Sequence, residues 1–313
     1  MIDLDIKKQV GDFSLDISLK TDQKVLGILG QSGSGKTMLL RTIAGLVDPD
    51  QGYIRVGREF FNSYENLSLD PGQRKIGYLF QSYGLFPHMT AEENLSFISK
   101  DKEKIKRLLG KVGLEDKKDL YPSQLSGGQK QRLAMARMLA TDPELILLDE
   151  PFSALDSILR QEMEDFMKDL IKGLDLPAIL VSHNREEVYR FCQDVLVIGD
   201  GKVEDMGPKE RVFTQPKTPY TARLVGFDLV LGQKYQEGFD FVDKPSYTIA
   251  IRSRDLEITK GSDFYVKVKY EGLTCKSYNI VNKKTGLSFR LSSDEDLKEG
   301  ESLGLRVYYF VKL

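Results

Sequence analysis

The 313-residue sequence has few of the features that mark a secreted or membrane-spanning protein. Its two cysteines, Cys192 and Cys275, lie far apart, without CxxC spacing or neighbouring histidines. Neither a disulfide framework nor a metal-cysteine site is therefore expected. No apolar run approaches the ~18 residues that suggest a membrane-spanning helix, and the first ten residues, MIDLDIKKQV, do not resemble a signal peptide. The sequence predicts a water-soluble protein of a reducing cytosol.

The chain also lacks an excess of positive charge. It has 45 Lys and Arg residues against 47 Asp and Glu residues, for a net charge of -2. Without a basic field, or a basic stripe interleaved with aromatics, nucleic acid is not an expected partner. Internal repeats and low-complexity tracts are absent from the sequence as well. The length allows one large domain followed by a small one.

Strand-like and helix-like segments alternate over the first two thirds of the chain. Apolar residues alternate over 13–19, as in a strand with one buried face, and the runs 145–148, 177–181 and 195–198 are almost wholly apolar, as in buried parallel strands. Helical spacing follows residue 37 and recurs over 105–112 and 155–174. Thr90 and Glu93 have the spacing of a capping box at a helix start. This order predicts an α/β fold with a mainly parallel sheet.

The pattern changes near residue 227. Beyond it, strand-like runs at 247–251, 264–270 and 304–311 are separated by turn clusters such as Lys-Gly-Ser-Asp at 260–263. We predict a domain of residues 1–227 and a small, barrel-like, all-β domain of residues 228–313.

The stretch GQSGSGKT, residues 30–37, fits the pattern G-x-x-x-x-G-K-[ST] through Gly30, Gly35, Lys36 and Thr37. Such a loop directs backbone N–H groups, here also from Gln31, Ser32, Gly33 and Ser34, toward phosphate oxygens at the start of a helix. Lys36 can reach the β- and γ-phosphates, and the Thr37 hydroxyl can ligate Mg²⁺. The alternative is a flexible glycine-rich turn, but a strand before it and a helix after it favour a phosphate loop.

The stretch LILLDE, residues 145–150, is a buried strand that ends in two carboxylates. Because successive side chains of a strand diverge, Asp149 and Glu150 are expected to have different roles. Asp149 suits the surroundings of Mg²⁺, and Glu150 can polarise an attacking water. The alternative is an acidic strand end that leads into a turn at Pro151.

A third segment, LSGGQKQR at 125–132, resembles the signature motif of ATP-binding cassette (ABC) ATPases. Ser126, Gly127, Gly128 and Gln129 begin a helix expected over 127–140, which gives the chain a second helix end suited to anions. Taken alone, Ser126 would be read as a plain helix cap. The position of the motif, about twenty residues before the acidic strand end, matches the family.

The resemblance implies a P-loop nucleotide-binding fold of the ABC type, with a parallel-sheet core, an antiparallel β portion and a helical subdomain. It also assigns further residues to nucleotide chemistry. Gln81 in GYLFQS is similar to the family's Q-loop glutamine, Asp156 in SALD (153–156) to its D-loop, and His183 in LVSHN to its switch histidine. The resemblance implies Glu150, His183 and Gln81 as catalytic residues, and Thr37, Gln81 and Asp149 around Mg²⁺. Phe13 either stacks on adenine or is a core residue. Asn184 departs from the family, in which many members carry aspartate after the histidine.

What the resemblance implies for assembly is a homodimer of cassettes that holds two ATP molecules between head-to-tail subunits. Each site would pair the phosphate loop of one subunit with the LSGGQ segment of the other. A helical subdomain at about 84–140 would receive two integral-membrane permease subunits, and a substrate-binding protein outside the membrane would act indirectly. The expected location is peripheral, at the cytoplasmic face of the membrane.

The cargo is predicted from lineage alone, because a cassette does not touch it. YGLFPHMTAEENL (83–95) resembles importers of inorganic anions, iron, polyamines and sugars, and VGDFSLDISLK with residues 58–81 looks most like molybdate importers. The β-rich tail resembles a regulatory OB-like domain that either binds an inhibitory anion or braces the dimer. Alternatives are import of sulfate, iron(III), polyamine or sugar, a soluble ABC ATPase, and a regulatory module with poor turnover.

Overall fold

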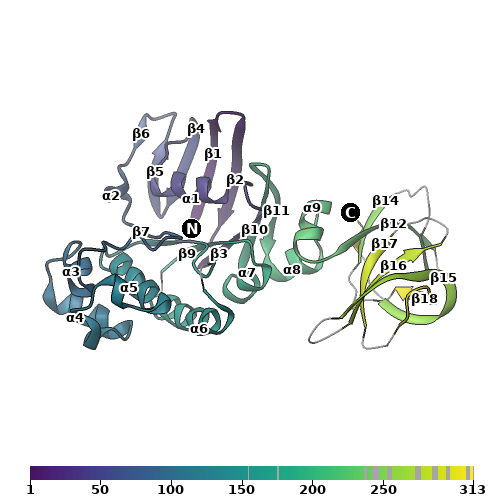
Figure 1. Cartoon of the computed structure of the whole chain (residues 1–313). Coiled ribbons are helices and arrows are strands. Elements are labelled where there is room, and N and C mark those ends of the chain that lie inside the picture. Colours follow the sequence, from purple (N-terminus) through teal and green to yellow (C-terminus); the bar gives the residue numbers. More distant parts are fainter. Residues whose placement is uncertain are drawn as a thin grey trace. The chain divides into compact units, whose positions relative to one another are not determined.

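The computed structural model divides the chain into two compact units, Met1–Lys209 and Glu210–Leu313, which are described separately (Figure 1). The residues that the structure describes are 1–153, 155–174, 176–235, 238–241, 247–251, 256–271, 276–283, 288–293, 297–307 and 311–312. The division falls earlier than the boundary at 227/228 expected from the sequence. Helix α9 (Pro219–Leu224) groups with the second unit because it contacts that unit's first strands, β12 (Asp228–Tyr235) and β14 (Tyr247–Ile251).

An 11-stranded sheet forms the centre of the first unit, in the order β6-β5-β4-β1-β2-β11-β10-β3-β9-β8-β7. Its parallel part pairs β10 (Asp194–Gly199), β3 (Val25–Leu29), β9 (Ala178–Ser182), β8 (Leu145–Asp149) and β7 (Ile76–Leu79). Every residue of β3, β8 and β9 is buried, as their largely apolar sequences predict. The carboxyl ends of these neighbouring strands meet at one edge, where open α/β sheets bind ligands.

The other part of the sheet is largely antiparallel, so the sheet is mixed rather than mainly parallel. It comprises β1 (Ile2–Val10), β2 (Phe13–Thr21), β4 (Gln51–Val56), β5 (Arg58–Asn62), β6 (Leu67–Ser68) and β11 (Lys202–Pro208). Strand β2 buries Leu15, Ile17 and Leu19 on one face, as its alternation predicts. The α/β fold with a parallel core and an antiparallel portion is confirmed.

Helix α1 (Lys36–Ala44) follows the glycine-rich loop and packs Leu39, Leu40 and Ile43 into the main hydrophobic core. Arg74, at the end of α2 (Pro71–Arg74), is fully buried against the end of α1. Its guanidinium donates to the carbonyl oxygens of Thr42 and Ile43, each at 2.9 Å. Burial lowers the pKa of Arg74. The arginine thus donates to two carbonyls in the last turn of α1, of which Thr42 O also accepts from Gly45 N at 3.1 Å.

The expected helical segment contains α3 (Ala91–Ser96), α4 (Lys102–Lys111), the 3₁₀ turns Glu115–Lys117 and Pro122–Gln124, and α5 (Gly127–Leu139). Figure 1 shows α3, α4 and α5 grouped together, and α4 contacts both of the other two helices. The capping box is present: Thr90 Oγ1 accepts from Glu93 N at 3.2 Å, and Glu93 Oε2 accepts from Thr90 N at 2.7 Å. Two more helices, α6 (Ser157–Leu174) and α7 (Arg185–Phe191), complete the unit.

The second unit contains most of α8 (Lys209–Thr214), all of α9 and two four-stranded sheets. One sheet has the order β13-β12-β14-β19, with β13 at Gly238–Phe241 and β19 at Val311–Lys312. The other has the order β17-β16-β15-β18, formed by Ser288–Ser293, Lys276–Asn282, Leu256–Glu271 and Ser302–Val307. The described part of the chain beyond residue 227 is therefore rich in strands, and an OB-like fold stays a prediction.

The turn predicted at 260–263 is wrong. Strand β15 runs through these residues, and its register against β18 shifts from Thr259↔Gly304 to Phe264↔Leu303. Four residues therefore lie between positions that face consecutive residues of the partner strand. Turn-forming residues also suit a bulge, so their composition alone does not separate the two structures.

No helix in the described part of the chain combines the length and the apolar character needed to cross a bilayer.

Candidate functional site

The glycine-rich loop leaves the buried end of β3 at Leu29 and enters α1 at Lys36. Gly35 caps the helix with φ 102°, a left-handed conformation that glycine adopts readily. A Cβ there would lie only 2.9 Å from Phe13 Cζ. Because α1 has no side-chain cap, its first N–H groups stay available to an anion.

Lys36 is held by the loop itself. Its ammonium donates to Gly30 O at 2.9 Å and to Gln31 O at 2.8 Å. Burial lowers the pKa of Lys36, and the carboxylates of Glu150 and Asp149 oppose that shift. The loop therefore holds a partly desolvated cation, and such a cation can bind a phosphate through charge-assisted hydrogen bonds.

Asp149, at the end of β8, accepts two hydrogen bonds within the site. Thr37 Oγ1 donates to Oδ1 at 3.0 Å, and the Tyr78 hydroxyl donates to Oδ2 at 2.9 Å. Burial, with the neighbouring Asp149 charge, raises the pKa of Tyr78. Tyr78 was missed by sequence reasoning. Its position could have indicated a role, because it lies on β7, three residues before Gln81, and β7 pairs with β8.

Glu150 turns away from Asp149 and faces His183. Glu150 has φ 47°, and its Oε2 lies 3.2 Å from His183 Nδ1. The two residues follow the neighbouring strands β8 and β9. The structure thus places a carboxylate and an imidazole together, as a water-activating site requires.

Gln81 follows β7 and reaches the same region. Its amide nitrogen donates to Ser153 Oγ at 3.3 Å, and Ser153 Oγ donates to Glu150 O at 2.9 Å. In the SALD stretch, Ala154 lies outside the described residues, and Asp156 Oδ1 accepts from Leu159 N at 3.0 Å. The chain therefore brings Gln81 and the beginning of this stretch to the Glu150 side of the site.

One cavity of about 410 Å³ brings together part of the phosphate loop, Phe13, Gln81 and Glu150, whereas Asp149 and His183 do not line it. Phe13 lines it and is also packed against the hydrophobic core, so its position is compatible with both expected roles. Met38 was not predicted as a lining residue. The cavity is lined by Phe13, Ser32, Gly33, Gly35, Lys36, Thr37, Met38, Gln81 and Glu150.

The signature segment lies elsewhere, at the start of α5. Ser126 caps this helix: its Oγ accepts from Gln129 N at 3.3 Å, and Gln129 Oε1 accepts from Ser126 N at 3.0 Å. A Cβ on Gly128 would lie 2.8 Å from Leu159 Cδ1 on α6, while Gly127 has more room. Among the described residues that line the 410 Å³ cavity, none comes from 126–129.

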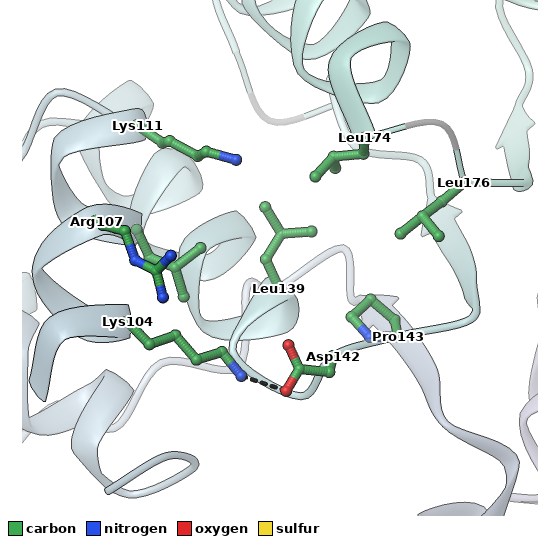
Figure 2. A pocket seen from close by; sticks show the side chains of 9 residues that line it. Lys104, Arg107, Lys111, Leu139, Asp142, Pro143, Leu174 and Leu176 are labelled. Atoms are coloured by element: carbon green, nitrogen blue, oxygen red, sulfur yellow. Dashed lines mark hydrogen bonds and ion pairs between the residues drawn. The ribbon is translucent and has the colours of Figure 1, made fainter. Parts of the chain in front are cut away.

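A second hollow, of about 340 Å³, lies between α4 and the end of α6 (Figure 2). Lys104, Arg107 and Lys111 line it from α4, and Lys104 is bonded to Asp142 at 2.6 Å. None of the residues predicted to bind nucleotide lines this hollow. Apart from the signature segment, the predicted catalytic and metal-binding residues lie near the carboxyl edge of the sheet.

Comparison with known proteins identifies the family. A family model described as "ABC transporter" matches residues 13–153. The spermidine/putrescine import ATP-binding protein PotA of Clostridioides difficile is 33% identical over 95% of this chain and 90% of its own length. The chain belongs to the ABC transporter ATPase family.

Relatives of this ABC ATPase carry different cargo names. A sulfate/thiosulfate import ATP-binding protein CysA of Synechocystis sp. is 40% identical over 71% of this chain. A molybdenum import ATP-binding protein ModC of Paramagnetospirillum magneticum is 37% identical over 71% of this chain. The chain spans 64% of the length of each of these two relatives.

A solved cassette supports the fold and the chemistry. The dimeric ATP-binding cassette MJ0796, in a post-hydrolysis state with ADP and Pi, superposes with a TM-score of 0.55 and 29% sequence identity. The match covers 67% of this chain and 99% of that cassette. The ABC chain is an ATPase, and its nucleotide-binding fold is that of a cassette.

Proposed function

We propose that this ABC ATPase hydrolyses ATP in the 410 Å³ cavity and thereby powers the import of an inorganic oxyanion. The observation that carries the proposal is the arrangement around Lys36. Thr37 and Asp149 are bonded on one side of the loop, and Glu150 faces His183 on the other. One binding position can therefore present phosphate to a cation and water to a carboxylate.

The residues have separate tasks in this mechanism. The loop N–H groups and Lys36 bind and orient the phosphates, which holds the γ-phosphate next to Glu150. Glu150 accepts a proton from the attacking water. His183, 3.2 Å from that carboxylate, orients it. Gln81, through Ser153, lies on the same side and orients the water.

The residues present fit Mg²⁺. Thr37 Oγ1 and Asp149 Oδ1 lie 3.0 Å apart at the phosphate loop, and a hard divalent cation prefers such oxygen ligands. Thr37, Asp149 and Gln81 would hold the ion. When bound, the ion neutralises charge on the phosphate oxygens.

A homodimer would complete the site. Since residues 126–129 do not line the phosphate-loop cavity of their own chain, they are available to the nucleotide of a second copy. Head-to-tail pairing would bring Ser126 and the start of α5 against that copy's γ-phosphate. The dimeric cassette of the similar solved structure supports this assembly.

The membrane partner would dock near Gln81. Phe86 is half-buried, and its ring lies 4.8 Å from the Phe97 ring and 4.8 Å from the Arg137 guanidinium. Phe97 is 58% exposed and Ile98 39% exposed, which leaves an apolar surface beside the Q-loop segment. Two permease subunits on this surface would place the ATPase at the cytoplasmic face of the membrane.

The names of several relatives support an oxyanion cargo. Sulfate/thiosulfate import is named in the relative with 40% identity, and molybdenum import in one with 37%. We propose sulfate or molybdate, two tetrahedral dianions, as the cargo, and the relatives favour sulfate over the molybdate first indicated by the sequence. A polyamine is the second candidate, because the spermidine/putrescine relative matches nearly the whole chain.

Deletion of the gene tests the cargo. Uptake of radiolabelled sulfate, molybdate and spermidine is measured in the deletion strain, with wild-type and Glu150→Gln chains returned separately. We expect loss of uptake of one oxyanion, restored by the wild type alone. Loss of spermidine uptake only would replace the oxyanion proposal. Unchanged uptake of all three would favour a soluble ABC ATPase.

A further inference from the structure

His183 stands between two residues that share one buried partner. Ser182 Oγ donates to Glu187 Oε2 at 2.5 Å, and Asn184 Nδ2 donates to Glu187 Oε1 at 3.2 Å. Glu187 lies on α7 and is only 5% exposed. A buried carboxylate is tolerated when donors satisfy its oxygens, and here each oxygen accepts from one neighbour of the histidine.

Two further hydrogen bonds show that Ser182 and Asn184 are the donors to Glu187. Asn184 N donates to Ser182 Oγ at 2.9 Å, so the single hydroxyl proton of Ser182 goes to Glu187. Glu186 N donates to Asn184 Oδ1 at 2.9 Å, which leaves the amide nitrogen of Asn184 to face Glu187. The network therefore restrains the backbone on both sides of His183.

The His183 side chain has little other support. It is 61% exposed, so packing holds little of the ring, and the contact that the structure shows for it is with Glu150. The network and this pair face one small hollow of about 40 Å³. Its lining residues are Glu150, Ser153, Arg160, Ser182, His183, Asn184 and Glu187.

Helix α7 is also anchored about one turn further along. Arg190 pairs with Glu164 of α6, a carboxylate that is itself buried. Glu187 therefore lies on a helix that an ion pair anchors to α6. Because α7 restrains Ser182 and Asn184 through Glu187, it also limits the positions that the His183 imidazole can take.

We infer that Glu187 is a positioning residue, which holds His183 in reach of Glu150 through Ser182 and Asn184. It does not touch the nucleotide cavity, so its loss acts on turnover rather than on ATP binding. Asn184 is part of the hydrogen-bond network that positions His183. An aspartate there would still cap α7, but it would turn a second oxygen toward Glu187 Oε1, where the amide nitrogen now donates.

The donor and the acceptor can be exchanged to test the inference. Glu187→Gln alone puts an amide nitrogen opposite a donor, and Asn184→Asp alone puts two carboxylate oxygens together. We expect each single variant to lower kcat about tenfold, with little change in ATP affinity, because a displaced catalytic group loses its alignment. The double variant restores a donor–acceptor pair, since the introduced amide donates to the introduced carboxylate. Its kcat should return to within about threefold of the wild type, a coupling that independent sites would not show.

Glu186→Gln is the matched control, because Glu186 is the exposed neighbour on the same helix and the chemical change is identical. ATP affinity is measured with a fluorescent ATP analogue, and folding by thermal unfolding. The inference is overturned if Glu187→Gln turns over like the control, if ATP affinity falls in parallel with kcat, or if the double variant is no better than the worse single one. Should the double variant unfold, Ser182→Ala serves as a second test and should lower kcat with ATP affinity retained.

The inference rests on the proposed roles of Glu150 and His183, and Glu150→Gln is therefore measured alongside. Normal hydrolysis by Glu150→Gln would remove those roles. Failure of the exchange at 184 and 187, with Glu150→Gln inactive, would remove only the role of Glu187.

Discussion

Thr37 and Asp149, which are 112 positions apart in the sequence, share a hydrogen bond of 3.0 Å at the start of α1. Tyr78 occupies the other oxygen of the same carboxylate. With both oxygens engaged, Asp149 is held in one orientation, and Glu150 is left to face His183. This division of tasks between adjacent carboxylates underlies the predictions below.

Glu150→Gln should retain ATP binding and lower the rate of hydrolysis by at least ~10²-fold, as expected on losing the group that accepts a proton from water. It should also accumulate an ATP-bound dimer, because bound nucleotide is no longer consumed. Phosphate release and size-exclusion chromatography with ATP measure the two effects. Glu103→Gln, on the exposed surface of α4, is the control. Near-normal hydrolysis by Glu150→Gln would contradict the assignment.

A mixture of Lys36→Ala and Ser126→Arg chains tests the shared site. In a heterodimer, one composite site keeps its own Lys36 and its partner's Ser126, while the other site carries both lesions. We expect the mixture to recover nucleotide binding at about one site per dimer. Equilibrium binding of a fluorescent ATP analogue measures the stoichiometry, with each homodimer as control. Binding equal to the average of the two homodimers would argue against head-to-tail pairing.

Phe86→Asp should uncouple import from hydrolysis, because it places a charge in the apolar surface proposed for the permease. Uptake into vesicles that contain the permease should fall, while the purified subunit keeps its basal hydrolysis. Because Phe86 is half-buried, thermal unfolding is measured in parallel. Phe97→Asp tests the same surface at a more exposed ring. Loss of both activities would show that Phe86 is part of the core, and retention of both would place the partner elsewhere.

Arg74→Met should lower the stability of the first unit. It leaves the carbonyls of Ile43 and Leu69 without this buried donor and takes one of two donors from Thr42 O, at a cost of about 3 kcal/mol. A loss of this size corresponds to a fall in Tm of about 6–12 °C for a domain near 200 residues. Arg107→Met, on exposed α4, is the control. An unchanged Tm for Arg74→Met would mean that water satisfies these carbonyls.

Sequence reasoning described the first unit better than the second. The apolar runs form β8, β9 and β10, and Thr90 caps α3, as expected. Both features depend on residues that are close together in the sequence. The turn expected at 260–263 is instead part of β15, because pairing with β18 continues on both sides of these residues. Local composition cannot reveal that pairing.

The sequence by itself determined the cassette family and the phosphate loop. The loop's function depends on contiguous glycines and on Lys36 at its end, and so it can be read along the chain. The tertiary structure decided which groups meet. Tyr78 joins Asp149, Glu150 faces His183, and Ser182 and Asn184 donate to Glu187. The first two meetings depend on the order and register of β7, β8 and β9, and such pairing between separate segments is encoded by no local pattern. The third lies within six residues and depends on how the chain turns from β9 into α7.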